Sequence, residues 1–298
     1  MKLFCALCLL STAAAGMQTP DVFVHLFEWK WSDVALECEK VLGPAGFSAV
    51  QVSPAMEHIK GDAWWTRYQP VSYEINSRSG NETEFKDMTT RCNNVGVNII
   101  ADAVINHMAA SPEGEQEGVA GTSYYGRNFQ PYNYNADLMH HNNNDVSSNC
   151  IVNDYNSAYN VQQCDLVSLV DLNTENTEVQ DIISQYIIKM KKLGVNGYRV
   201  DAAKHIQSIS LKSIMNKVNN DDSITSASAS ASKSMWNFQE VIYGDNEPIT
   251  PDEYLNNGSG YVTEFRYGTN IFNCFHTNTG SNTNTNTNTN TNTNTNTN

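Results

Sequence analysis

The 298-residue sequence predicts an α/β fold of repeated strand–helix units, in which a closed (β/α)8 (TIM) barrel is favoured over an open doubly wound sheet. Short apolar runs alternate with segments whose apolar residues recur at helical spacing. Polar residues follow several of these runs, at 106–107, 201–205 and 240, and barrel enzymes build their active sites at the carboxyl ends of strands. No glycine-rich phosphate loop follows an early run, which argues against a nucleotide-binding sheet.

The first part of the chain has the order strand, helix, strand, helix, strand. The three strands are expected at 22–27, 47–52 and 97–105, and the last is a nearly continuous apolar run, typical of a parallel strand covered on both faces. Ser32 is expected to cap the first helix, and Gly43 with Pro44 is expected to end it. The second helix carries an apolar stripe from Phe85 to Val95.

The alternation stops at residues 107–172, a stretch rich in Asn, Tyr, Gly and Ser that predicts an inserted subdomain or a functional loop. It resumes with a helix for which Thr177 and Gln180 form a capping box and Gly194 marks the end. A strand within 196–205 follows at once. The remaining elements are expected as a helix at 206–218 and strands at 236–241 and 261–265.

The two ends of the sequence differ in composition from the rest. Lys2, the apolar run at 3–10 and small residues at 13–16 have the layout of a secretory signal peptide, and no later run is long enough to span a membrane. The Asn/Thr repeat at 277–298 can bury nothing, so we expect it to be disordered. The predicted segments are therefore a signal peptide at 1–16, barrel at 17–106, an inserted domain at 107–172, barrel at 173–276 and a tail at 277–298.

The net charge restricts the class of partner that the protein can bind, and the cysteines bear on whether it forms disulfides. Only 18 Lys and Arg oppose 32 Asp and Glu, a formal net charge of −14, which argues against a nucleic-acid partner. A secreted protein is expected to form disulfides. Five cysteines remain after the signal segment, an odd number: Cys38, Cys92, Cys150, Cys164 and Cys274.

Three ionisable residues on two predicted strands are the candidate catalytic residues. Arg199 and Asp201 point the same way from one strand, because alternate residues share a face. Taken alone they could be a structural ion pair. Glu240 adds a second carboxylate in an apolar frame, and two carboxylates at one barrel mouth are what glycoside hydrolysis needs. Arg199 is expected to keep Asp201 ionised as a nucleophile, and Glu240 is expected to hold its proton.

Sugar sites also need flat apolar platforms. Trp64, Trp65 and Tyr68 place three aromatic side chains within five positions of the loop that follows the second strand. Adjacent tryptophans are more often packing residues, but their place on the catalytic side of the barrel favours a role in binding.

Three segments carry a specific family resemblance. DAVINH (102–107), GYRVDAAKH (197–205) and FQEVI (238–242) occur in order, with VHLFEWKW, GFSAVQVSP, WWTRYQPVSYEINSRSGNE and VTEFRYG around them. From about Val22 to Gly268 the chain resembles animal-type α-amylases of the large (β/α)8 family of α-glucan glycoside hydrolases. The resemblance implies a secreted monomer that cleaves internal α-1,4-glucosidic bonds of starch, glycogen and maltooligosaccharides, with no nucleic-acid or membrane partner.

The resemblance also implies a role for each matched residue. Asp201 would be the nucleophile and Glu240 the general acid/base of a retaining mechanism, while Arg199 would orient Asp201 and, in chloride-dependent members, bind an allosteric chloride. The residues implied to contact the glucan are Trp64, Trp65, Tyr68, Gln69, His107, Lys204 and His205.

Calcium and two disulfides are further implications of the resemblance. The insertion corresponds to the family's B domain, which calcium would hold to the barrel through Asn106, Asp171 and the backbone carbonyls of Gln162 and His205. The implied disulfides join Cys38 to Cys92 and Cys150 to Cys164, and Cys274 has no partner that we can identify.

The sequence also departs from the family pattern. Six of the eight barrel strands can be counted before the Asn/Thr repeat, and neither the family's fourth signature, with a third catalytic Asp, nor its C-terminal β-sandwich follows. The stretch SITSASASASKS (223–234) is poor in apolar residues for a segment that leads into a barrel strand. An alternative is therefore an inactive glucan-binding or vestigial protein. A transglycosylase or α-glucosidase is a weaker third alternative.

Overall fold

The computed structural model describes residues 20–110, 112–129, 138–140, 150–221, 235–257 and 260–276. The predicted signal peptide (1–16), the Asn/Thr tail (277–298) and the Ser-rich stretch (223–234) lie outside the described residues. The chain divides into two units, Met1–Thr263 and Glu264–Asn298, and the first contains the sheet and the candidate site. Within the described residues, no helix has the length and apolar character needed to cross a membrane.

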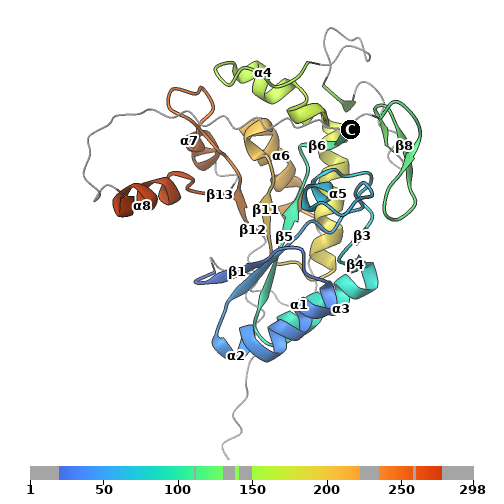
Figure 1. Ribbon diagram of the computed structural model, residues 1–298, viewed down its shortest axis with the longest axis vertical. Helices are drawn as coiled ribbons and strands as arrows, with labels where there is room; N and C mark the ends of the chain where they lie inside the picture. The colour runs from blue at the N-terminus through green and yellow to red at the C-terminus, as the bar shows by residue number, and fades with distance from the viewer. Residues whose placement is uncertain are drawn as a thin grey trace, which may run out of the picture. The chain divides into compact units, whose positions relative to one another are not determined.

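A six-stranded parallel sheet forms the centre of the first unit (Figure 1). Its strands follow one another in chain order: β1 (Phe23–Leu26), β2 (Ala49–Val52), β5 (Asn98–Ala103), β11 (Gly197–Val200), β12 (Trp236–Gln239) and β13 (Tyr261–Val262). All six strands occur within or next to the predicted runs. The central strands are buried on both faces, as the continuous apolar runs predict.

The sheet is strongly curved. The ring of Phe23 in β1 lies 6.2 Å from Trp236 and 5.8 Å from Phe238, both on β12, between ring centroids. Side chains of the first and fifth strands can meet only if the sheet curls toward itself, which is the geometry of a barrel wall and not of a flat open sheet.

The first helical stretch differs from the expected one at both ends. It consists of α1 (Trp31–Glu37), a π-helical segment (Cys38–Leu42) and α2 (Gly43–Ala45). Lys30 is the N-cap residue, and Ser32 lies inside the helix. Gly43 and Pro44 do not end the helix, because proline is tolerated in the first turn of a helical segment, where its missing N–H is not needed. Gly46 ends it instead, in the left-handed region at φ 81°.

The longer helices cover the sheet. They are α3 (Glu82–Asn94), α5 (Thr177–Lys192) and α6 (Ser208–Asn219), followed by the short α7 (Pro251–Asn256). Thr177 and Gln180 do not form the expected capping box. Asn176 caps α5 by accepting the Glu178 backbone N–H at 2.8 Å, and Gln180 donates to the Thr174 carbonyl at 2.9 Å. Asn competes well for the cap position because its short side chain reaches the free N–H groups.

The insertion is built largely from short antiparallel strands. β6 (His107–Ala110) pairs with β10 (Leu169–Asp171), so the two ends of the insertion lie side by side. Between them lie a three-stranded sheet and a short helix: β7 (Gln116–Glu117), β8 (Ser123–Tyr125), β9 (Asn128–Phe129) and α4 (Ala158–Gln163). A small hairpin of β3 (Asn76–Ser77) and β4 (Gly80–Asn81) precedes α3.

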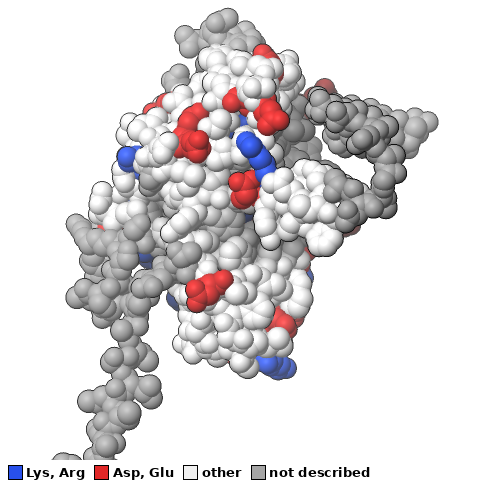
Figure 2. Space-filling view, turned by 90° about the vertical axis from the view of Figure 1, so that its left-hand side faces the viewer, with Lys and Arg blue, Asp and Glu red and all other residues white. Residues whose placement is uncertain are grey.

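Both disulfides implied by the family resemblance are formed. Cys38–Cys92 joins the first helical stretch to α3, and Cys150–Cys164 closes a loop in the insertion. Among the described cysteines, Cys274 is unpaired and exposed; it lies on α8 (Arg266–His276) of the second unit. Figure 2 shows charged side chains scattered over one face of the molecule, and the described residues in view form no continuous basic surface.

Candidate active site

The candidate site lies at the carboxyl ends of three neighbouring strands. Asp102 is in β5, Arg199 is in β11, and Asp201 and Glu240 directly follow β11 and β12. The strand register places Arg199 beside Asp102 on one side and Phe238 on the other. Parallel pairing therefore brings residues that are far apart in the sequence to one edge of the sheet.

One guanidinium holds three carboxylates together. Arg199 Nη1 donates to both oxygens of Asp102, at 2.8 and 2.9 Å, and to Asp201 Oδ1 at 2.7 Å. Arg199 Nη2 lies 2.7 Å from Glu240 Oε1. The other Glu240 oxygen accepts the Ala202 backbone N–H at 2.9 Å. We call Asp102, Arg199, Asp201 and Glu240 the carboxylate cluster.

A single cation does not neutralise this cluster. Burial raises the pKa of Asp201 to about 8, and the nearby Asp102 and Glu240 carboxylates also raise it, against the lowering effect of Arg199. Burial also raises the pKa of Asp102. The expectation that Arg199 alone would keep Asp201 ionised is therefore not met in the free protein. With three carboxylates around one guanidinium, the cluster retains at least one proton near neutral pH.

Asp102 was not predicted as a site residue. It begins the DAVINH segment, and its position in an apolar strand was the available signal, but its partner could not be known without the register of β5 and β11. Its side chain is fully buried, and Tyr68 donates its hydroxyl to Asp102 Oδ2 at 2.9 Å. Burial raises the pKa of Tyr68, so its hydroxyl remains a donor. Arg199 also lies 5.9 Å from the centre of the Tyr68 ring.

His107 connects the cluster to the insertion. It begins β6, it is buried, and its Nε2 donates to the Tyr68 carbonyl at 3.0 Å. Burial lowers the pKa of His107 to about 4, so the imidazole is neutral at pH 7 and uses one ring nitrogen for this bond.

The two predicted tryptophans form an exposed surface. Trp64 and Trp65 belong to a 3-10 helix (Trp64–Tyr68), and they are 57% and 48% exposed. The Trp64 ring lies 6.0 Å from the rings of Phe27 and Tyr68. With about half of their surface exposed, the two adjacent tryptophans are not simply packing residues. We call Trp64 and Trp65 the tryptophan ledge.

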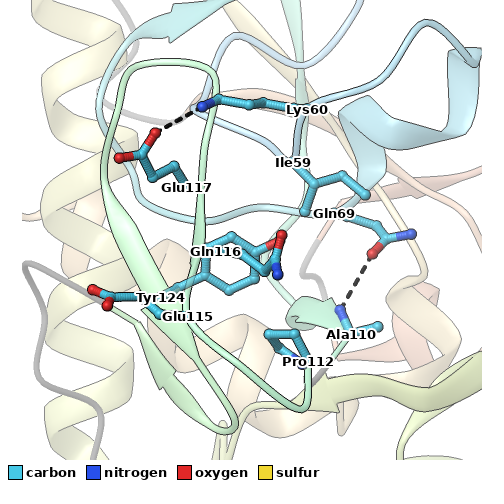
Figure 3. Close-up of a pocket in the computed structure, with 9 residues that line it drawn as sticks. All are labelled: Ile59, Lys60, Gln69, Ala110, Pro112, Glu115, Gln116, Glu117 and Tyr124. Atoms are coloured by element: carbon cyan, nitrogen blue, oxygen red, sulfur yellow. Dashed lines mark hydrogen bonds and ion pairs between the residues drawn. The ribbon is translucent and has the colours of Figure 1, made fainter.

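Gln69, which directly follows this 3-10 helix, lines a pocket. The pocket has a volume of about 780 Å³ and lies between the chain after β2 and the β7–β8 hairpin (Figure 3). Gln69 Oε1 accepts the Ala110 backbone N–H at 3.2 Å, and Lys60 forms an ion pair with Glu117 at 2.8 Å. Asp201 and Glu240 do not line this pocket, so it is not the candidate catalytic site.

Lys204 and His205 lie in another 3-10 helix (Ala203–His205), after Asp201. Lys204 Nζ forms an ion pair with Glu247 and lies 4.7 Å from the centre of the Tyr155 ring. His205 Nδ1 donates to the Val161 carbonyl at 2.8 Å, and burial lowers its pKa to about 4. Both side chains are buried and have partners from other segments. They connect the cluster to α4 and to the loop after β12.

A second polar group lies at the base of the insertion. Asn106 Nδ2 donates to Asp171 Oδ1 at 3.0 Å, and His140 donates to Asp171 Oδ2 at 2.6 Å and to Glu175 Oε2 at 2.8 Å. Although burial lowers the pKa of His140, these two carboxylates raise it to about 9. His140 was not predicted, because nothing in its local sequence marks its two carboxylate partners.

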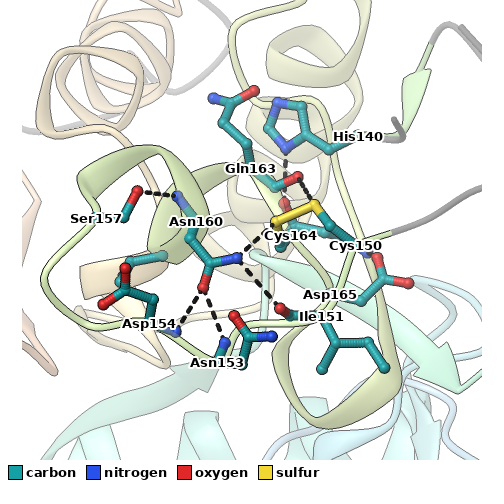
Figure 4. The surroundings of a disulfide bond; sticks show 12 residues. His140, Cys150, Ile151, Asn153, Asp154, Ser157, Asn160, Gln163, Cys164 and Asp165 are labelled. Carbon is teal, nitrogen blue, oxygen red and sulfur yellow. Dashed lines mark hydrogen bonds and ion pairs between the residues drawn. A yellow bond between two sulfur atoms is a disulfide. The ribbon is translucent and has the colours of Figure 1, made fainter. Parts of the chain in front are cut away.

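The other two predicted calcium ligands lie on adjacent segments. Gln162 is in α4, which His205 contacts through its bond to Val161. Gln163, the last residue of α4, donates to Glu175 at 2.7 Å, and Glu175 accepts from His140, a partner of Asp171. The disulfide Cys150–Cys164 closes the loop that contains α4 (Figure 4). These bonds connect α4 to the 3-10 helix Ala203–His205 through Val161, and to the base of the insertion through Gln163 and Glu175.

A family model described as the alpha-amylase catalytic domain matches residues 42–295. An alpha-amylase-related protein of Drosophila orena is 42% identical over 283 residues, covering 91% of this chain and 55% of that protein. The crystal structure of wild-type alpha-amylase I from Eisenia fetida matches with a TM-score of 0.79 and 36% identity, over 89% of this chain and 54% of that chain.

A Glu-to-Gln variant of the same Eisenia fetida protein, crystallised with maltohexaose, matches equally well, with a TM-score of 0.79 and 35% identity over 89% of this chain and 54% of that chain. The present chain spans about half the length of the curated relatives that it matches.

Proposed function

Because the chain belongs to the alpha-amylase catalytic-domain family, we propose that it hydrolyses internal α-1,4-glucosidic bonds of starch and glycogen with retention of configuration. The observation that carries this proposal is the carboxylate cluster, which holds Asp201 and Glu240 around Arg199 at the ends of adjacent strands. We further propose secretion, which the two disulfides support because disulfides persist in oxidising compartments. That the protein acts as a monomer stays a prediction.

In the proposed mechanism the two carboxylates have different protonation states. Ionised Asp201 attacks the anomeric carbon, while Glu240 gives its proton to the glycosidic oxygen, so that the bond to the leaving sugar breaks as the bond to Asp201 forms. Glu240 then takes a proton from water, and the hydroxide replaces Asp201 at the anomeric carbon. The reactive form is therefore the one in which Asp201 is ionised and Glu240 carries the proton that the leaving group needs.

The surrounding residues are proposed to hold the glucan. The exposed faces of Trp64 and Trp65 suit the apolar face of a glucose ring, and Tyr68 extends this surface toward the cluster. His107, Gln69, Lys204 and His205 would contact sugar hydroxyls, in part by exchanging their present partners. The maltohexaose complex of the Eisenia fetida variant supports an oligomeric α-glucan as the ligand.

Digestion of soluble starch tests this proposal. We expect the purified protein to reduce iodine staining much faster than it releases reducing ends, because cleavage inside the chain shortens helices before it makes many ends. Glucose as the first product would indicate an α-glucosidase, and products longer than the substrate would indicate a transglycosylase. Binding of maltoheptaose without cleavage would support the glucan-binding alternative and contradict the proposal.

The calcium ligands implied by the family fit that ion in chemistry. Asn106, Asp171 and the carbonyls of Gln162 and His205 are all oxygen donors, and Asp171 is a buried carboxylate whose present partners are the Asn106 amide and His140. Among the described residues no group of three or more His, Cys, Asp or Glu forms a metal site, so the amide and the carbonyls are essential to this assignment. Calcium would neutralise Asp171 and hold the insertion to the barrel.

The proposed calcium site predicts sensitivity to chelators. Adding EDTA should lower the melting temperature of the protein by about 5–10 °C, because a tightly bound ligand of the folded state adds a few kcal/mol of stability. Asp171→Asn should remove most of this response. Differential scanning fluorimetry with and without calcium measures both effects. An unchanged melting temperature in EDTA would show that the assignment of Asn106 and Asp171 is wrong.

Chloride fits the carboxylate cluster less well than calcium fits its proposed ligands. Both amino groups of Arg199, the implied chloride ligand, contact carboxylates within the described part of the chain. An anion placed there would be repelled by the ionised carboxylates of the cluster. We therefore derive no step of the mechanism through chloride.

A further inference from the structure

We propose that Glu28, Arg67 and Arg78 position the tryptophan ledge for glucan binding. This inference rests on the proposed function, because it concerns the same ligand. We call the three residues the Glu28 clamp. They come from three segments of the chain: Glu28 follows β1, Arg67 is in the 3-10 helix of the ledge, and Arg78 is in the turn between β3 and β4.

Arg67 anchors the 3-10 helix from its buried side. Its side chain is only 2% exposed, in contrast to Trp64 and Trp65 on the same short helix. Arg67 Nε forms an ion pair with Glu28 Oε1, and Nη1 donates to Ser79 Oγ at 2.9 Å. A buried guanidinium is tolerated only with such partners, so the contact with Glu28 fixes which side of the helix faces inward.

Arg78 holds the chain that enters the ledge. Its Nη1 donates to the Gly61 carbonyl at 2.6 Å, and its Nη2 donates to the Ala63 carbonyl at 3.2 Å and to Glu28 Oε2 at 2.8 Å. Ala63 is the N-cap residue of the 3-10 helix, directly before Trp64. A planar guanidinium can serve these three acceptors at once, whereas a lysine ammonium lacks the fork geometry.

Glu28 links both arginines to the end of β1. Each of its carboxylate oxygens contacts one arginine, and its backbone N–H donates to Ser53 Oγ at 2.8 Å. Its backbone has φ 69°, a conformation that glutamate rarely adopts and that the surrounding contacts must maintain. The preceding residue, Phe27, contacts the ring of Trp64.

The arrangement explains how two exposed tryptophans can keep one orientation. Within the described part of the chain about half of each tryptophan surface stays exposed and is available to a sugar, so the orientation of these side chains depends largely on the backbone that carries them. A ledge fixed before the ligand arrives loses less conformational entropy on binding. The clamp therefore acts through the ledge on glucan affinity, and its residues are positioning residues that do not themselves take part in the reaction.

Maltoheptaose titrations followed by tryptophan fluorescence test the clamp, with Asp201→Asn as the common background to prevent turnover. Trp64→Ala, Arg78→Gln and Glu28→Gln should each weaken binding by about tenfold. Arg78→Lys should lie between Arg78→Gln and the parent, because it keeps the charge but not the fork. Arg91→Gln removes an arginine of α3 from two surface ion pairs, with Glu39 and Asp87; it is the matched control and should change affinity by less than about twofold.

Acrylamide quenching supplies a readout that a loss of stability alone would not change. We expect acrylamide to quench the ledge tryptophans more strongly in the folded clamp variants than in Arg91→Gln. The comparison is made between variants that have the same melting temperature.

Clamp variants that bind maltoheptaose as tightly as the parent, while Trp64→Ala binds weakly, would overturn the clamp but leave the proposed function intact. If Trp64→Ala also binds as tightly as the parent, the ledge has no part in glucan binding, and this portion of the proposed function fails. If Arg78→Gln does not fold, Arg78→Lys and Glu28→Gln decide the question.

Discussion

Asp201→Asn is expected to lower starch hydrolysis by at least about 10³-fold while leaving maltoheptaose binding intact. The amide keeps the shape of the side chain but cannot form the bond to the anomeric carbon. It can still accept a hydrogen bond from Arg199, so the cluster should remain assembled. Reducing-sugar release from soluble starch measures the effect. Asp181→Asn, which removes a carboxylate from an exposed ion pair with Lys217, is the matched control and should retain activity.

The same variant has an expected effect on stability. The pKa of Asp201 is about 8 in the folded protein, above its usual value of about 4, so the folded state binds more protons than the unfolded state between these values. The contribution of Asp201 to stability therefore falls as the pH rises through this window. Asp201→Asn should flatten the pH dependence of unfolding by urea and should be more stable than the parent near pH 8. A variant that is less stable than the parent throughout this window would contradict the raised pKa.

Arg199→Gln is the second substitution with a large expected effect. It leaves three buried or half-buried carboxylates without their common cation, and removing one partner from a buried ion pair costs about 3–5 kcal/mol of unfolding free energy. Urea unfolding near neutral pH measures this loss. The loss should shrink at acid pH, because protonated carboxyl groups need no cation.

Arg91→Gln again supplies the control. Arg91 also contacts carboxylates, those of Glu39 and Asp87, but on the surface, where such pairs are worth about 0–1 kcal/mol. An equal loss for the two variants at neutral pH would show that the cluster does not depend on Arg199 in the way we describe.

The sequence predicted the sheet well because each strand is a short apolar run between polar segments. It failed at helix ends, where several residues compete for one role. Asn176 takes the cap that Thr177 was expected to provide, and the first helical stretch continues past Pro44 to Gly46. Such choices depend on which side chain reaches a free N–H group, and spacing alone does not determine this.

The sequence predicted those residues of the candidate site that lie at the carboxyl ends of strands. Arg199, Asp201 and Glu240 meet as expected, because parallel strands bring their carboxyl ends to one edge. Asp102 and His140 were missed, because their partners lie on other segments. The direction of the Asp201 pKa shift also differed from expectation, since burial and the number of nearby carboxylates follow only from the packed structure.

Cleavage of an α-1,4-glucan by Asp201 and Glu240 in two successive displacements can be followed at the anomeric carbon. Proton NMR of the first product released from maltoheptaose distinguishes the two product configurations, because their anomeric protons are resolved before they interconvert. Two inversions at one carbon predict that the new reducing end appears first as the α-anomer. Initial release of the β-anomer, or bound maltoheptaose that remains uncleaved, would contradict the account.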